Sequence, residues 1–294
     1  MNGFKEKYSQ FCGQFEDVLA DYLKTLSVRP NVLREGICYA LGSGGKRVRP
    51  VLMFACAVML GGKIADISDL ALALEMIHSY SLAHDDLPAM DDDDFRRGKP
   101  SLHKQFGEGQ AILIGDALLN EAYLQCLNTC KKGRSYLNAS LLICENAGKD
   151  GMVAGQSADL YYEGNEEFDE KSYEFIVLNK TARMIVSAVV APALVYNTDE
   201  NITNILIEYG KNLGRLFQLT DDILDVTGDF NKLGKTIGKD EKEKKLSAIR
   251  LYGIEKCNEQ ADHLLELCLA LLRQLPFECS FLEDFTKYLR CREK

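Results

Sequence analysis

Residues 175–196 read FIVLNKTARMIVSAVVAPALVY, a stretch that would be apolar around most of the circumference of a helix. This pattern is typical of a helix buried in the middle of a bundle, because a surface helix keeps one polar face. Apolar residues also recur at three- and four-residue spacing over 202–226 and 254–275, and alternating patterns typical of strands are nearly absent. The sequence therefore predicts an all-α protein.

Clusters of glycine, proline and polar residues separate these helical stretches, and no linker, low-complexity run or repeat divides the chain. With 294 residues, of which 46% are hydrophobic, the chain is long enough for a substantial core. We therefore expect residues 1–294 to form a single domain, a large helical bundle of about ten or more helices.

Acidic residues outnumber basic ones by 44 to 35, which gives a formal net charge of −9 at pH 7. This balance counts against a general nucleic-acid binder, which needs a basic surface to displace counterions from phosphates. It does not exclude a small anionic substrate, because a local cluster or a metal can overrule the global charge.

The compartment is predicted from what the sequence lacks. Residues 1–24 are amphipathic without the apolar core of a signal peptide, and no run reaches the roughly 18 to 20 apolar residues that a membrane span needs. The ten cysteines are scattered without a CxxC pair, which favours reduced thiols. We expect a cytoplasmic protein without a membrane span.

Residues 85–97 read DDLPAMDDDDFRR. A charge run of this kind is usually a solvated loop. Here, however, Asp85 and Asp86 directly follow an apolar helical stretch, where carboxylates repel one another and gain nothing from packing. Pro88 limits continuation of the helix and turns the later aspartates relative to the first pair.

A second cluster, DDILD at 221–225, is embedded in apolar sequence, and on a helix Asp221 and Asp225 project from one face. One such cluster could be structural, but two on separate apolar helices favour a bound cation. Carboxylates without histidine or cysteine indicate a hard cation. Mg²⁺ fits best, because it is typically held by one or two carboxylates together with phosphate oxygens and water.

Basic residues accompany both clusters. The stretch GSGGKRVRP at 42–50 places three cations after a glycine-rich turn, where backbone N–H groups can approach an anion and Arg49 can offer a bidentate contact. Arg96-Arg97, Lys180-Thr181 and Lys235-Thr236 are further candidates, although each pair alone is more commonly a surface feature. Together the acids and bases predict a site for metal and diphosphate.

These motifs resemble those of the trans-prenyltransferases, the short-chain isoprenyl diphosphate synthases, and among them the bacterial-type farnesyl diphosphate synthases (geranyltranstransferases). Residues 85–97 resemble the first aspartate-rich motif, in the variant with four residues between the aspartates, and FQLTDDILD at 217–225 resembles the second. The stretch 44–50, Gly155-Gln156 and Lys180-Thr181 match further motifs, so the resemblance runs from about residue 40 to 240.

The resemblance implies a helical bundle of the isoprenoid synthase type around a central cavity. It implies a Mg²⁺-dependent, head-to-tail (1′-4) condensation of dimethylallyl or geranyl diphosphate with isopentenyl diphosphate, which gives mainly farnesyl diphosphate and releases diphosphate. Several Mg²⁺ ions would bind with the allylic diphosphate. A homodimer is also implied, by similarity only.

The resemblance further implies residue roles. Mg²⁺ would be bound by Asp85, Asp91 and Asp221, with support from Asp86, Asp222 and Asp225. The allylic diphosphate would be held by Arg96, Lys180, Thr181, Gln218 and Lys235, and isopentenyl diphosphate by Lys46, Arg49, His78 and Arg97. The catalytic set is then Asp85, Asp86, Asp91, Arg96, Lys180, Asp221 and Lys235. His78 alone could be a core histidine, but it precedes Asp85 by seven residues, about two helical turns, and so shares its face.

Product length is predicted from Tyr80, which lies five residues before Asp85 and roughly 7.5 Å deeper along a helix. In the family, an aromatic residue at this position stops the growing chain at C15. Five residues correspond to about 140° around a helix, however, so Ser81 points closer to the Asp85 face and Tyr80 could be a packing aromatic.

The chain departs from the family pattern at Lys245-Leu246-Ser247-Ala248, so Lys235 is favoured over Lys239 and Lys245 as a ligand. The basic residues near the C-terminus, Arg290, Arg292 and Lys294, could close over diphosphate, but a frayed tail is the favoured interpretation. Alternative functions are a geranylgeranyl diphosphate synthase, a terpene cyclase, and a silent prenyltransferase-like subunit, which would be expected to lose one aspartate cluster.

Overall fold

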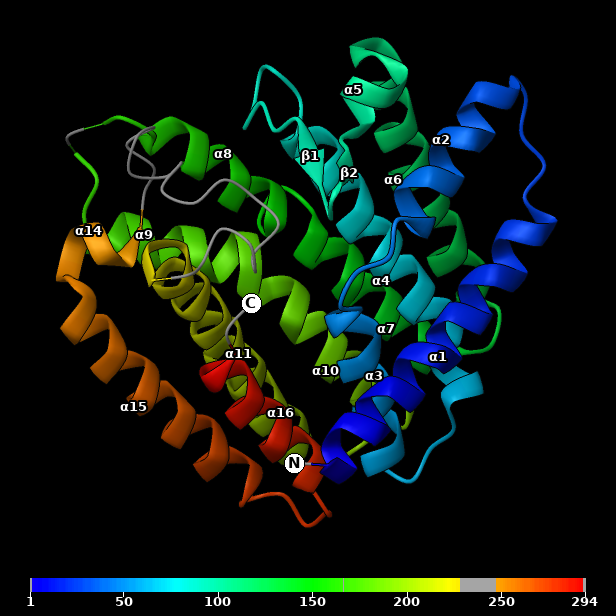
Figure 1. Ribbon diagram of the computed structural model, residues 1–294. Helices are drawn as coiled ribbons and strands as arrows, with labels where there is room; N and C mark the ends of the chain where they lie inside the picture. Colours follow the sequence, from blue (N-terminus) through cyan, green and yellow to red (C-terminus); the bar gives the residue numbers. More distant parts are fainter. Residues whose placement is uncertain (1, 166, 228–246, 293–294) are drawn as a thin grey trace.

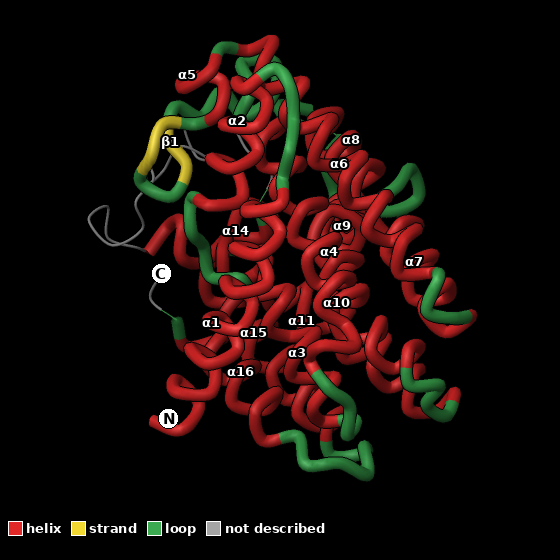
Figure 2. Tube along the Cα trace, turned by 90° about the vertical axis from the view of Figure 1, so that its right-hand side faces the viewer, coloured by secondary structure: helices red, strands yellow, loops and turns green. Residues whose placement is uncertain are grey.

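The computed structural model describes residues 2–165, 167–227 and 247–292. Helices dominate this part of the chain (Figure 2), as the sequence predicts. The first half contains α1 (Asn2–Thr25), α2 (Asn31–Gly42), α3 (Val48–Met59), α4 (Ile64–Asp85), α5 (Leu102–Phe106), α6 (Glu108–Cys130) and α7 (Arg134–Ala147). The second half contains α8 (Met152–Tyr162), α9 (Glu170–Ile176), the π-helix η1 (Val177–Ala182), α10 (Arg183–Val195), α11 (Glu200–Thr227), α14 (Ala248–Tyr252), α15 (Ile254–Leu272) and α16 (Ser280–Cys291).

The apolar stretch 175–196 forms the centre of the bundle (Figure 1), where α10 packs against α3, α7 and α11. All residues of α10 except Arg183 and Leu194 are buried. By length and composition, the 26 residues Glu170–Val195 could cross a membrane, but 78% of their apolar window is buried inside the protein. Burial of this extent identifies a core helix of the bundle.

This central helix is not uniform, because η1 introduces a π turn between α9 and α10. The sequence predicts a helix over 175–196; the structure is helical there and adds a π turn that the apolar pattern does not predict. Single π turns inside α-helices occur frequently at functional sites, since they shift the side chains on one face. Lys180 and Thr181, two of the predicted site residues, lie in this turn.

The two ends of the described chain pack together, since α1 contacts α3 and α16 in a shared hydrophobic core. Aromatic rings fill this contact. Phe11 lies 5.2 Å from Phe281 in an edge-on arrangement, measured between ring centroids, and Phe4 lies 5.3 Å from the same ring. Helix α1 is therefore packed against the bundle through its aromatic side chains.

A small antiparallel hairpin interrupts the helical pattern, with β1 (Phe95–Arg96) paired to β2 (Lys99–Pro100). Its two turn residues, Arg97 and Gly98, have φ values of 56° and 74°. Turns with positive φ at both central positions match the twist of a hairpin, and glycine adopts them readily. This hairpin directly follows the first aspartate motif and was not predicted from the sequence.

Candidate active site

Both aspartate motifs meet at one cleft of about 290 Å³, bounded by α4, α8, η1, α11 and the loop after α4. The side chains at the cleft come from elements far apart in the sequence. Those that bear on the chemistry are Asp85, Asp91, Arg96, Lys180, Gln218 and Asp222. The two motifs that the sequence predicts to act together are therefore brought together by the fold.

Asp85 ends α4 and faces the cleft. Burial raises the pKa of its carboxyl group to about 7; Lys180 opposes this shift, while the nearby carboxylate of Asp91 adds to it. A pair of carboxylates in this position is electrostatically unfavourable on its own and is relieved by a bound cation. The donor set thus fits a hard divalent ion.

Asp86 points elsewhere. It is buried and accepts a hydrogen bond of 2.9 Å from Nε of Arg96, whose guanidinium also lies 3.3 Å from Asp93. Burial raises the pKa of Asp86, although the contact with Arg96 opposes the shift. Because β1 carries Arg96, this ion pair attaches the hairpin to the end of α4.

The exposed aspartates of the first motif lie toward α5. Nζ of Lys104 lies 2.8 Å from Asp94, and Nε2 of the buried His103 lies 4.0 Å from Asp92. One ligand atom each of Asp92, Asp94 and His103 falls within 4.8 Å of the others. His103 was not among the residues predicted from the sequence.

Asp222 is the aspartate of the second motif that lines the cleft. It accepts hydrogen bonds from the Tyr173 hydroxyl (2.9 Å), Nε2 of Gln218 (2.9 Å) and the backbone N–H of Ala248 (2.8 Å). Burial nevertheless raises its pKa to about 7. Asp222 therefore joins α11 to α9 and α14, and neither Tyr173 nor Ala248 carries a sequence signal for this role.

Asp221 and Asp225 have different surroundings. Asp225 is buried, whereas the Asp221 side chain is 42% exposed and pairs with Nη2 of Arg292 at 2.6 Å. Arg292 also donates to the backbone carbonyl of Phe217 (3.2 Å) and lies over its ring at 4.4 Å. The favoured interpretation of a frayed basic tail is therefore wrong for Arg292, because this side chain is buried against the second motif.

Two residues of α8 lie against Lys180: Asp159 pairs with its side chain, and Gly155 packs against its backbone. The Lys180 ammonium group donates a hydrogen bond to the carboxylate of Asp159. Burial lowers the pKa of Lys180, but the carboxylates of Asp159 and Asp85 raise it by more, so the pKa is raised. One helical turn before Asp159, a Cβ atom at Gly155 would lie only 2.1 Å from the backbone nitrogen of Lys180. No motif marks Asp159 in the sequence, although its spacing of four from Gly155 places both on one face of α8.

Thr181 and Gln218 connect the π turn to the second motif. The Thr181 hydroxyl donates to Oε1 of Gln218 at 3.0 Å, and Gln218 in turn donates to Asp222. Both residues are predicted to bind the allylic diphosphate; the structure places them in contact, with Gln218 lining the cleft and Thr181 buried behind it. Lys235, predicted for the same group, lies outside the described residues, as do Lys239, Lys245 and Lys294.

Arg49, His78 and Arg97 form a separate positive cluster. Burial holds the pKa of His78 well below its usual range, and Arg49 and Arg97 lower it further, so the imidazole is neutral at physiological pH. Nε of Arg49 is buried without a hydrogen-bond partner among the described residues. Three of the four residues predicted to bind isopentenyl diphosphate therefore lie within electrostatic reach of one another.

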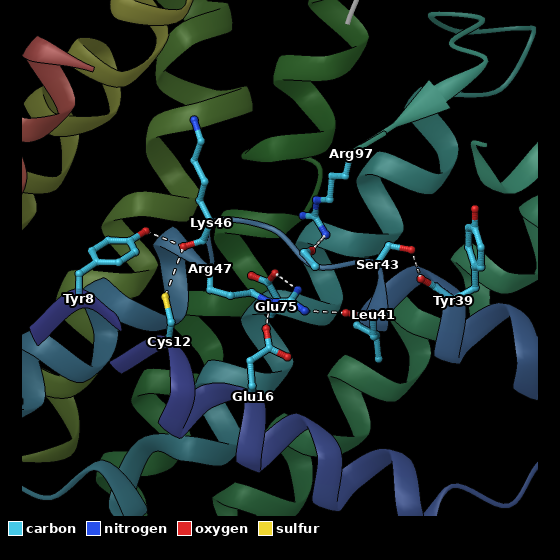
Figure 3. A network of polar contacts seen from close by, with 11 residues as sticks. Tyr8, Cys12, Glu16, Tyr39, Leu41, Ser43, Lys46, Arg47, Glu75 and Arg97 are labelled. Carbon is cyan, nitrogen blue, oxygen red and sulfur yellow. Dashed lines mark hydrogen bonds and ion pairs between the residues drawn. The ribbon is translucent and has the colours of Figure 1, made fainter. Parts of the chain in front are cut away.

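Arg47 differs from its neighbours Lys46 and Arg49. It adopts a left-handed backbone conformation (φ 49°), and its guanidinium turns into the protein (Figure 3). There it pairs with Glu16 and Glu75, each at 2.8 Å. Of the three cations that follow the glycine-rich turn, Arg47 is therefore a structural residue.

Tyr80 and Ser81 precede the cleft on α4. Tyr80 is buried, and its ring lies edge-on to the ring of His84 at a centroid distance of 5.8 Å. The Ser81 hydroxyl donates to the backbone carbonyl of His78 at 2.9 Å. Their roles in product length remain predictions.

Known proteins are similar to this chain in sequence and in fold. The farnesyl diphosphate synthase of Micrococcus luteus is 44% identical over 223 residues, 76% of each chain. The geranylgeranyl pyrophosphate synthase 12 of Arabidopsis thaliana is 42% identical over 241 residues, 80% of this chain and 67% of the relative. A solved geranyltransferase from Helicobacter pylori, complexed with magnesium and isoprenyl diphosphate, superposes with a TM-score of 0.84 at 31% identity and covers 96% of this chain and 94% of its own.

The family model for polyprenyl synthetases matches residues 30–274, which include every helix that borders the cleft. This match, together with the identity to the relatives named above, shows the family of the chain. The chain belongs to the polyprenyl synthetase family and is a prenyltransferase.

Proposed function

We propose that the protein catalyses the Mg²⁺-dependent 1′-4 condensation of dimethylallyl or geranyl diphosphate with isopentenyl diphosphate, with farnesyl diphosphate as the main product. The observation that carries this proposal is the convergence of Asp85, Asp91 and Asp222 with Lys180 at one cleft, beside the positive cluster of Arg49, His78 and Arg97. The name of the Micrococcus luteus relative supports the C15 product.

The carboxylates of Asp85 and Asp91, with the second motif opposite, suit Mg²⁺ bound together with the allylic diphosphate. When bound, Mg²⁺ neutralises the charge that grows on the departing diphosphate. Lys180 adds a fixed positive charge to the same cleft, held in place by Asp159. The magnesium in the Helicobacter pylori structure supports this assignment.

The positive cluster suits the second substrate. Arg49 and Arg97 offer bidentate donors to a diphosphate, and neutral His78 can donate one further hydrogen bond. Held there, isopentenyl diphosphate would present its double bond to C1 of the allylic substrate. The C1–oxygen bond breaks as diphosphate leaves, the new C1–C4 bond forms, and the departed diphosphate takes the proton that is lost.

Incubation of the purified protein with dimethylallyl diphosphate, isopentenyl diphosphate and Mg²⁺ tests the proposal. We expect elongated products, mainly C15, when the reaction is sized by chromatography after dephosphorylation. Omission of Mg²⁺ should abolish them. A complete lack of elongation would defeat the proposed reaction.

A geranylgeranyl diphosphate synthase is the second candidate, because the Arabidopsis relative with that name matches nearly as well. Tyr80 separates the two. We predict that Tyr80→Ala shifts the main product from C15 to C20 or longer, since it removes the ring that would block the growing chain. An unchanged C15 product in Tyr80→Ala would remove Tyr80 from this role.

We also propose a homodimer through the outer face of α6 and α7. Leucines on these neighbouring helices are exposed, among them Leu127 (64%), Leu124, Leu137 and Leu141. An exposed apolar face of this kind favours a protein partner, and a second copy of the chain is the partner that the family resemblance implies.

Leu127→Asp is therefore expected to convert a dimer of about twice 32.9 kDa into a monomer, measured by size exclusion with light scattering, because a desolvated carboxylate costs several kcal/mol. Leu267→Asp on α15 introduces the same charge elsewhere and should leave the mass unchanged. A Leu127→Asp protein that stays dimeric would contradict this interface.

A further inference from the structure

Helix α1 contacts the loop between α2 and α3 (residues 43–47), which carries Lys46, one of the four residues predicted to bind isopentenyl diphosphate (Figure 3). The Tyr8 hydroxyl donates a hydrogen bond of 2.5 Å to the backbone carbonyl of Lys46. Sγ of Cys12 approaches the same carbonyl at 3.8 Å. The contact joins residues 38 positions apart and fixes the backbone directly at Lys46.

Glu16, further along α1, binds Arg47, the residue that follows Lys46 in the loop. Tyr8, Cys12 and Glu16 are spaced four apart and share one face of the helix. Glu16 accepts from Nε of Arg47 at 2.8 Å, while Nη1 of Arg47 reaches Glu75 on α4 at 2.8 Å. Two charged contacts and the Tyr8 hydrogen bond therefore tie consecutive loop residues to α1 and α4.

The loop is also held from the opposite side, where Arg97 of the hairpin donates to the backbone carbonyl of Gly44. In Figure 3 the Lys46 side chain extends away from Glu16, on the side of the loop where Arg97 lies. Because Arg47 turns inward, Lys46 is directed outward by the same backbone. The contacts of α1 thus hold the backbone from which the Lys46 side chain projects.

We propose that Tyr8 and Glu16 are positioning residues for isopentenyl diphosphate, acting through the backbone of Lys46 and Arg47. The inference rests on the proposed function and extends it to residues that lie before the part of the chain matched by the family model, which begins at residue 30. The residues predicted to hold the allylic diphosphate, Lys180, Thr181 and Gln218, are instead carried by η1 and α11, so we expect the effect to fall on isopentenyl diphosphate.

The test is Tyr8→Phe, which removes the hydroxyl and keeps the ring in its contacts with Phe4 and Phe285. We expect KM for isopentenyl diphosphate to rise about three- to tenfold, the effect of one hydrogen bond lost from a positioning contact. The KM for the allylic diphosphate and kcat should stay unchanged. Calorimetric titration of isopentenyl diphosphate should show the same fold-change in Kd.

Tyr22→Phe is the matched control, since Tyr22 lies on the same helix and its hydroxyl donates to Glu121 at 3.1 Å, far along α1 from the loop. It should leave both KM values unchanged. Glu16→Gln provides a second variant and should raise the same KM as Tyr8→Phe.

Three results would overturn the inference: an unchanged KM for isopentenyl diphosphate in both variants, an equal rise in both KM values, or the same rise in Tyr22→Phe. Failure of the proposed function looks different. In that case the wild-type protein itself would neither bind isopentenyl diphosphate in the titration nor elongate a chain.

Discussion

Asp85→Asn is expected to lower turnover by about a hundredfold or more without unfolding the protein, because under the proposed function it removes a charged metal ligand from the site where diphosphate leaves. The structure adds an expectation for stability. The pKa of Asp85 is raised to about 7 in the folded protein, so its ionisation opposes folding as the pH rises from its unfolded value of 3.8 through 7. The asparagine variant should therefore melt at the same or a higher temperature at pH 8.

Asp92→Asn is the matched control, since it makes the same change seven residues later at a side chain that is 62% exposed. It should keep near-normal turnover. Steady-state kinetics and thermal melts at pH 8 measure both variants. Near-normal turnover in Asp85→Asn, or equal losses in the two variants, would refute the metal-binding role of Asp85.

Gly155→Ala is expected to reduce both stability and activity. A Cβ atom at this position would lie 2.1 Å from the backbone nitrogen of Lys180 and 2.7 Å from its Cα. Backbone atoms inside the central helix cannot move aside cheaply, so we expect a loss of about 1–3 kcal/mol in the free energy of unfolding. Turnover should also fall, because α8 and η1 must separate and Lys180 must shift.

Gly13→Ala is the control for this prediction. Gly13 lies within α1, and a Cβ atom there would have nothing within 4 Å. Alanine should stabilise the helix by about 0.5–1 kcal/mol and leave turnover unchanged. Chemical denaturation and steady-state kinetics measure both variants, and a Gly155→Ala protein with unchanged stability would contradict the close approach of α8 and η1.

Much of the fold could be predicted because it depends on local patterns. The apolar repeat over 175–196 identifies the central helix. Pro88 marks the end of α4, whose last residue is Asp85. The hairpin at residues 95–100 and the π turn at η1 could not be predicted in this way. Each depends on a few residues whose conformation is stabilised by contacts with other elements, Arg96 with Asp86 in the first case and Lys180 with Asp159 in the second.

The candidate site, too, could be predicted only in part from the sequence. The motifs predicted which residues lie near one another at the site, and Asp85, Asp91, Lys180 and Gln218 do line one cleft. Their supporting partners could not be found from the motifs. Asp159, Tyr173 and Tyr8 are common residues at unremarkable positions, and only their neighbours in space give them a role.

The sequence by itself determined that this protein is helical and that it carries two acidic motifs, because helical periodicity and clustered like charges are properties of short segments. The tertiary structure alone decided which aspartates face the cleft. Asp222 is oriented by Tyr173, 49 residues away, and Asp221 by Arg292, 71 residues away. The direction of a carboxylate depends on the donors and charges that pack against it, and those come from segments that no local pattern connects.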